Sequence, residues 1–109
     1  MINITPKFIK SIDSNSLLYL DAQSNYTFLT FKNGHKKLYS YHLKVFENSV
    51  LPNNFIRVSR SKLINITYIN RTLKNGSDLY VILQDETRVL IPRKRRKELI
   101  AKFPEIFGI

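Results

Sequence analysis

Short runs of apolar, aromatic and β-branched residues recur along the chain, and polar turn residues separate them. This pattern is typical of β-strands. It predicts strands at residues 6–12, 16–22, 25–31, 36–41, 55–58, 63–69, 79–83 and 87–91. Asn33-Gly34 is the pair preferred in tight type I′ hairpins, whose central residues both need positive φ. A second Asn-Gly pair lies in the predicted turn at residues 74–78. We expect a mostly antiparallel sheet structure of about eight strands.

Two segments have a helical period instead. Leu43, Phe46 and Val50 recur at helical spacing and predict a short amphipathic helix over residues 42–50. Pro92 is predicted to start a second helix at its favoured first-turn position, with Leu99, Ile100 and Phe103 facing inward. Since no repeat, linker or low-complexity segment interrupts the chain, residues 1–109 are expected to form one mainly β domain with two short helices.

A polar step interrupts the strongly apolar segment FIRVSRSKLINITYI, residues 55–69. Ser59, Arg60, Ser61 and Lys62 place two hydroxyls and two cations between β-branched runs. A simple turn would more often contain Gly, Asn, Asp or Pro. We therefore interpret the step as a working surface that leaves the core, held rigid by its apolar flanks. Such support lowers the entropy that a loop gives up on binding.

The chain is strongly basic, with 18 Lys and Arg against 8 Asp and Glu, a net charge of +10. Only one acid, Glu47, lies between Ala22 and Ser77, among nine basic residues. A second cluster, Arg93 to Lys97, occupies the start of the predicted last helix. Cations there oppose the helix dipole, each at a cost of about 0.3–1 kcal/mol when exposed. The cluster favours a docking site for an anion such as phosphate, although a later helix start would also explain it.

Several classes of function have no matching residues. The chain has no cysteine, and His35 and His42 lack the spacing to further ligands that a zinc site needs. Ser59 and Ser61 are not in a nucleophile elbow, and no glycine-rich phosphate loop is present. We expect no enzyme activity, metal, cofactor or small-molecule substrate. A run of 18 apolar residues and a signal-peptide core are also absent, so we expect a cytoplasmic protein with no membrane partner.

Three segments, LYLDAQSNYTFLTFKNG, LPNNFIRVSRSKLINITYI and RVLIPRKRRKEL, resemble the LytTR (LytR/AlgR-type) DNA-binding domain in order and spacing. The resemblance covers residues 16–100. The family motif P-x-x-F-x-R-x-H/S-R/K-S-x-x-V/I-N is matched by Pro52, Phe55, Arg57, Ser59, Arg60, Ser61, Ile64 and Asn65. Ser59 stands where the family often has His. The resemblance implies an elongated stack of small antiparallel sheets that binds double-stranded DNA through loops in the major groove. It also implies an output domain of a response regulator in a two-component system, or a stand-alone regulator, in bacteria.

By this resemblance, Asn25, Arg60 and Arg93 are expected to contact bases. Asparagine presents the donor and acceptor that pair with adenine, and arginine matches guanine O6 and N7. Contacts to the DNA backbone are expected from Ser59, Ser61, Lys62, Lys94, Arg95 and Arg96, with Lys36, Lys37 and Tyr41 extending the footprint. The three segments are expected to converge into one cationic ridge.

Each of these interpretations has an alternative. Asn25 could cap a turn, and Ser59 and Ser61 could satisfy local backbone groups. Tyrosine and phenylalanine side chains in the segments 26–28 and 39–41 are more often packed in a sheet than stacked on bases. The protein could instead bind RNA or single strands on a small β domain, or be an interaction and dimerisation module that uses a sheet edge. Binding as two copies on repeated half-sites is a further expectation from the family.

Overall fold

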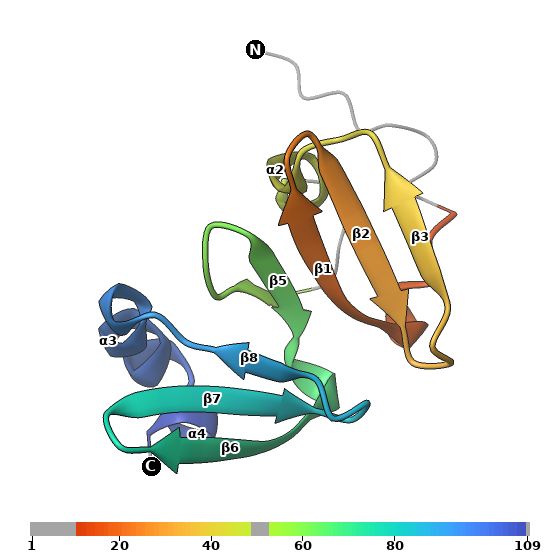
Figure 1. The fold of residues 1–109 in the computed structure, drawn as a ribbon. Helices are drawn as coiled ribbons and strands as arrows, with labels where there is room; N and C mark the ends of the chain where they lie inside the picture. The colour runs from red at the N-terminus through yellow and green to blue at the C-terminus, as the bar shows by residue number, and fades with distance from the viewer. Residues whose placement is uncertain (1–10, 49–52, 109) are drawn as a thin grey trace. The chain divides into compact units, whose positions relative to one another are not determined.

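The computed structural model describes residues 11–48 and 53–108. They form two compact units that divide between Ile66 and Thr67 (Figure 1). Each unit is built on its own antiparallel sheet, one of five strands and one of three. The expectation of a mainly β, antiparallel structure is therefore confirmed, and the described residues contain eight strands.

The first unit is a five-stranded sheet with one helix against it. Its strand order is β3-β2-β1-β5-β4. The bounds are β1 Leu17–Gln23, β2 Tyr26–Phe31, β3 Lys36–Tyr39, β4 Phe55–Arg57 and β5 Lys62–Asn65. A 3-10 helix, η1 (Ser14–Ser16), precedes β1, and α2 (Leu43–Glu47) follows β3. Leu43 and Phe46 of α2 are buried in one cluster with Leu17, Leu20, Leu29, Phe31 and Leu63 of the sheet. Burying each such side chain stabilises the fold by about 1.5–3 kcal/mol.

The side chain of a buried asparagine, Asn65 in β5, forms hydrogen bonds to Leu17 in β1 and to Asn54 before β4. Asn65 is 1% exposed. Its Nδ2 donates to the carbonyl of Leu17 at 2.9 Å, and its Oδ1 accepts from Nδ2 of Asn54 at 2.6 Å. The backbone N–H of Ile66 donates in turn to the carbonyl of Asn54 at 2.8 Å. A polar group in a core is tolerated when it is paired in this way, so Asn65 joins the end of β5 to the start of β1.

The second unit is a three-stranded meander followed by two helices. After the 3-10 helix η2 (Ile66–Tyr68), the order is β6 (Ile69–Asn75), β7 (Asp78–Leu83), β8 (Arg88–Leu90), α3 (Arg93–Lys102) and α4 (Pro104–Phe107). Leu99 of α3 and Phe107 of α4 are buried, as are Leu79, Val81, Leu83, Val89 and Ile91. The rings of Phe103 and Phe107 meet edge to face, with centroids 6.4 Å apart.

The sequence predictions for strands 16–22, 25–31, 55–58, 79–83 and 87–91 are confirmed to within a residue at each end. Leu43 and Phe46 face the core as predicted; Val50 lies outside the described residues. Most of the predicted strand 6–12 also lies outside them, and Ser11 and Ile12 form a turn and bend instead of a strand.

Five sequence predictions were wrong in detail. Residues 63–69 are not one strand, because η2 breaks them into β5 and β6, and most of β6 was not predicted. Here tertiary context overrides the strand propensity of Ile66, Thr67 and Tyr68. The predicted strand 36–41 ends two residues early, at Tyr39. Ile100 is 40% exposed and does not face inward. Pro92 caps α3 instead of starting it, and α4 is a further, third α-helix.

The loop at Asn33-Gly34 also differs from the predicted type I′ turn. Phe31 N–H donates to the carbonyl of His35 at 2.8 Å, so three residues, 32–34, form the loop. Of these, only Gly34 has a positive φ, at 86°. A left-handed glycine as the third residue is the usual arrangement of a three-residue hairpin loop. The positive φ of Gly34 was therefore predicted correctly, but the loop has three residues and not the two of a type I′ turn.

Candidate nucleic-acid interface

Two of the predicted DNA-contacting segments lie at the same end of the five-stranded sheet. The β1–β2 turn consists of Ser24 and Asn25, because Gln23 pairs with Tyr26. β1 is also antiparallel to β5, with Asp21 opposite Lys62. The N–H of Ala22 donates to the carbonyl of Ser61 at 2.8 Å. The end of β1 is therefore fastened to the connection between β4 and β5, residues 58–61, which we call the reading loop.

Asn25 and Arg60 are both exposed at this end of the sheet. Neither side chain makes a polar contact with another described residue, so both are available to a ligand. The alternative that Asn25 caps its turn therefore has no supporting contact within residues 11–48 and 53–108. Ser24, its neighbour in the turn, has a positive φ of 56°.

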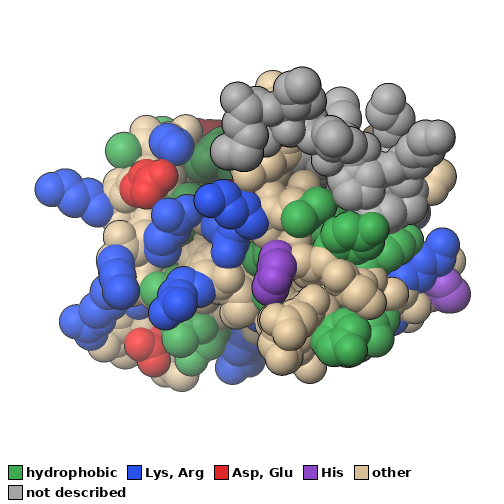
Figure 2. All heavy atoms as spheres, turned by 90° about the horizontal axis from the view of Figure 1, so that it is seen from above, with side chains coloured by type: hydrophobic (Ala, Val, Ile, Leu, Met, Phe, Trp, Pro, Cys, Tyr) green, Lys and Arg blue, Asp and Glu red, His purple; other side chains and the backbone are tan. Residues whose placement is uncertain are grey.

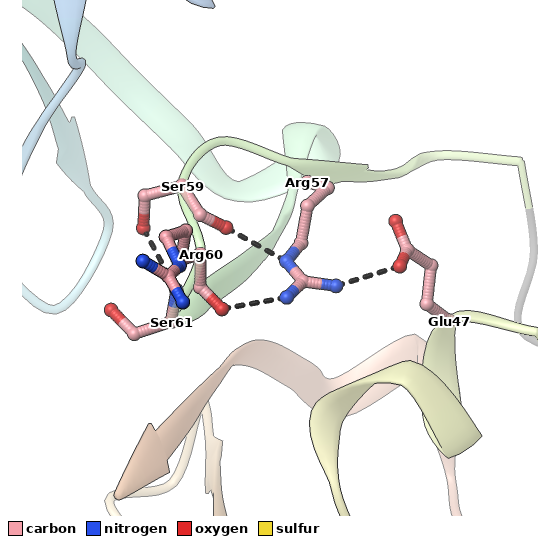
Figure 3. A network of polar contacts seen from close by, with 5 residues as sticks. All are labelled: Glu47, Arg57, Ser59, Arg60 and Ser61. Carbon is pink, nitrogen blue, oxygen red and sulfur yellow. Dashed lines mark hydrogen bonds and ion pairs between the residues drawn. The ribbon is translucent and has the colours of Figure 1, made fainter.

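The reading loop is closed by several hydrogen bonds. The N–H of Val58 donates to the carbonyl of Lys62 at 3.0 Å, and the N–H of Ser61 donates to Oγ of Ser59 at 3.3 Å. The expected alternative role for Ser59, satisfying a local backbone group, is thus present. The side chain of Arg57 also holds this loop (Figure 3). Sequence reasoning matched Arg57 only as a motif residue and gave it no role.

The segment after β3 reaches the same end of the sheet. Tyr39 lies opposite Thr27, and Oγ1 of Thr27 donates to the carbonyl of Tyr41 at 2.6 Å. Tyr26 and Tyr41 are 46% and 40% exposed, so neither ring is buried in the sheet. The expectation of packing is right for Tyr39, whose ring meets that of Phe46 at 5.7 Å.

Sequence reasoning also gave no site role to His42, the exposed N-cap residue of α2 directly after Tyr41. Its position could have been inferred from the hairpin. In a hairpin the residues that follow the second strand return to the end where the first strand began. The pairing of β2 with β3 therefore brings the segment after β3 back to the end that holds Asn25.

The three lysines of this unit that were predicted to contact the DNA backbone are Lys36, Lys37 and Lys62, and they do not share one environment. Lys36 and Lys37 are exposed at the opposite end of the sheet, where Lys36 lies opposite Thr30. The Nζ of Lys62 lies 3.0 Å from Oδ1 of Asp21 and 5.5 Å from the centroid of the Tyr19 ring. The charge of Lys62 is therefore partly neutralised within the protein.

The remaining predicted contacts are at the start of α3 in the second unit. Arg93 and Lys94 are exposed, and neither has a polar partner among the described side chains. No acid lies in the first turn, and no side chain caps it. By contrast, Nη1 of Arg95 lies 3.5 Å from Oε2 of Glu98, and Nη1 of Arg96 donates to the carbonyl of Ser77 at 2.8 Å. Within the cluster, Arg93 and Lys94 are available to a ligand, whereas Arg95 and Arg96 already contact groups of the protein.

Basic side chains outnumber acidic ones among the described residues. On the face drawn in Figure 2, Lys and Arg side chains gather mostly on the left, and acidic side chains are sparse. Such a surface attracts polyanions over a distance of about one Debye length, roughly 8 Å at physiological salt. Among the described residues, no group of three or more His, Asp or Glu could hold a metal ion. None of the described helices has the length and apolar character needed to cross a bilayer.

Comparison with known proteins decides the family. The model of the LytTr DNA-binding domain matches residues 7–103. The chain belongs to the LytTR family. A solved structure with the same fold is the LytTr DNA-binding domain of a protein assigned as a methyl-accepting/DNA response regulator from Bacillus cereus. The two superpose with a TM-score of 0.73 at 20% identity, over 83% of each chain. A search of curated proteins finds no match.

Membership in the LytTR family carries the general function. The family consists of DNA-binding domains and is not a family of enzymes. The LytTR domain described above therefore has DNA as its partner and acts in transcription regulation.

Proposed function

We propose that this LytTR domain recognises a specific sequence in double-stranded DNA by placing loops in the major groove. The observation that carries the proposal is that Asn25 and Arg60 share one end of the sheet, exposed and without polar partners in the described part of the chain. Asparagine and arginine are the side chains that read adenine and guanine in the major groove. A sheet end that presents both has the chemistry of direct readout.

The start of α3 supplies the proposed third contact and the electrostatic attraction. Arg93 follows the last hairpin and is proposed to reach a base, while Lys94 neutralises a phosphate. Because the family match spans both units, we propose that they bind one duplex as a single domain. The Tyr41 segment and Ser61 are proposed to contact the DNA backbone beside the reading loop.

The wider biological setting is proposed from membership in the LytTR family and from the B. cereus domain of the same fold. The domain would be the output half of a response regulator or a stand-alone regulator, and two copies would bind repeated half-sites. The B. cereus domain of the same fold comes from a protein assigned as a response regulator, which supports the first of these settings. The length of DNA protected by one and by two bound copies would distinguish single from paired binding.

The test begins with selection of bound duplexes from a random pool, followed by binding of the selected and a random duplex across a salt series. Arg60→Ala is expected to weaken binding to the selected duplex by about 5- to 150-fold, equivalent to roughly 1–3 kcal/mol, and to leave the random duplex unchanged. Lys94→Ala is the matched control. It should weaken both duplexes alike and lower the salt slope by about 0.9.

Three outcomes would contradict the proposal. Equal losses on both duplexes for Arg60→Ala would remove its base-reading role. Tighter binding of single strands or of RNA with the selected sequence would favour a stacking surface, for which Tyr26 and Tyr41 are exposed. Affinity that persists at high salt would favour a protein partner, because binding to DNA phosphates releases counterions.

A further inference from the structure

The guanidinium group of Arg57 is surrounded by three oxygen acceptors. Its Nε donates to the carbonyl of Ser59 at 2.7 Å, and its Nη2 donates to the carbonyl of Arg60 at 2.6 Å. Its Nη1 lies 2.7 Å from Oε1 of Glu47, at the end of α2 (Figure 3). Two of these acceptors belong to the consecutive peptide groups Ser59–Arg60 and Arg60–Ser61, so one side chain fixes the loop backbone on both sides of the Cα of Arg60.

These contacts decide which groups the loop presents. With the carbonyls of Ser59 and Arg60 turned to Arg57, two partial negative charges are paired with its guanidinium cation. The Arg60 side chain is left exposed on the loop. Carbonyl oxygens facing a duplex would repel its phosphates. Pairing these oxygens with Arg57 therefore favours the approach of an anion. It also fixes the loop before the ligand arrives, so less entropy is lost on binding.

Only arginine has the geometry for this arrangement. Its planar group carries five N–H donors in a fixed fork, whereas lysine has one ammonium on a flexible stem. The Arg57 side chain is 24% exposed and pairs with Glu47. Its charge is thus neutralised inside the protein, which argues against a phosphate contact. The role that these contacts leave is orientation of the loop.

We infer that Arg57 is a positioning residue for sequence reading: it shapes the reading loop so that Arg60 meets a base, and Glu47 holds Arg57 in place. This inference rests on the proposed function of the sheet end. It adds that discrimination between sequences depends on a residue that does not touch DNA, because the energy of the Arg60 contact is available only while the loop keeps this one conformation.

Two variants of Arg57, one that keeps the positive charge and one that removes it, test the inference. Arg57→Lys keeps the charge and loses the fork; Arg57→Ala loses both. Both are expected to lower affinity for the selected duplex by about tenfold or more and to leave affinity and salt slope on a random duplex unchanged. Arg71→Lys is the control, because Arg71 also pairs with a glutamate, Glu86, at 3.4 Å, but donates to no loop carbonyl in the described contacts. It should behave as wild type.

A measurement without DNA keeps the inference separate from the proposed function. Backbone order parameters of residues 59–61 in the free protein should fall from about 0.85 in wild type to below 0.6 in Arg57→Lys, while those of the strands stay high. If the wild-type protein prefers no duplex sequence, the proposed function fails. The order parameters would still show whether Arg57 holds the reading loop in one conformation. If Arg57→Lys binds as wild type while Arg57→Ala loses affinity on all duplexes with a lower salt slope, Arg57 is a phosphate contact and the inference is overturned. Unchanged order parameters in Arg57→Lys would overturn it as well.

Discussion

Replacing Asn65 by alanine is expected to destabilise the fold more than any exposed substitution near the reading loop. The change removes the donor to the carbonyl of Leu17 and the acceptor for Asn54. Each lost hydrogen bond is worth about 0.5–1.5 kcal/mol. The carbonyl of Leu17, a residue with 0% exposure, is then left without this partner, which adds part of a desolvation cost of about 1–3 kcal/mol. The sum is a loss of about 2–4 kcal/mol.

The assay is urea denaturation followed by circular dichroism, with Asn53→Ala as the matched control. Asn53 is exposed and next to Asn54, so its replacement should change the free energy of unfolding by less than about 0.5 kcal/mol. At temperatures where Asn65→Ala is still folded, its affinity for the selected duplex should equal that of wild type, since a buried amide cannot reach DNA. A stable Asn65→Ala variant with weakened DNA binding would refute this reasoning and make Asn65 a contact residue.

Two further predictions concern basic side chains that already contact another residue of the protein, Arg96 with Ser77 and Lys62 with Asp21. Arg96→Ala should lower the free energy of unfolding by about 0.5–1.5 kcal/mol, because the donor to the exposed carbonyl of Ser77 is lost. Its salt slope for DNA should stay at the wild-type value, and a slope lowered as much as in Lys94→Ala would show instead that Arg96 contacts phosphate. Asp21→Asn should release Lys62 and raise affinity for a random duplex, with a salt slope larger by up to about 0.9. A slope equal to that of wild type would mean that Lys62 lies away from the DNA.

The sequence was sufficient for the parts of the fold that depend on local chemistry. Leu43 and Phe46 at helical spacing predicted the buried face of α2. Alternating and aromatic runs predicted most strands, because a strand with one buried face needs residues of that kind at every second position. The polar step predicted at residues 59–62 lies between β4 and β5 at Ser59, Arg60 and Ser61, whereas Lys62 is half-buried and begins β5. The spacing of apolar residues around it allowed no continuous strand through Arg60.

Features that depend on distant partners were out of reach. η2 forms where Asn54 and Asn65, far apart in sequence, hold the chain at Ile66. The exposure of Tyr26 depends on which side of the sheet α2 covers, and sequence periodicity does not state this. Composition also cannot distinguish an available cation from an occupied one. Arg95 and Arg96 follow Lys94 directly, yet their guanidinium groups contact Glu98 and Ser77.

The family motif at residues 52–65 contains residues that pack in the core and residues that are exposed. Among its described residues, Phe55, Ile64 and Asn65 are directed to the core, where the structure gives them packing or hydrogen-bond partners. Arg57 lies at the boundary and faces the loop backbone. Arg60 alone among the charged motif residues is exposed without a polar partner in the described part of the chain. If position 60 meets a base, the motif fits that role: it allows Arg or Lys there, and both side chains can pair with guanine O6 and N7. Positions 57 and 65 are each a single residue type in the motif, because the loop must keep its shape for that contact.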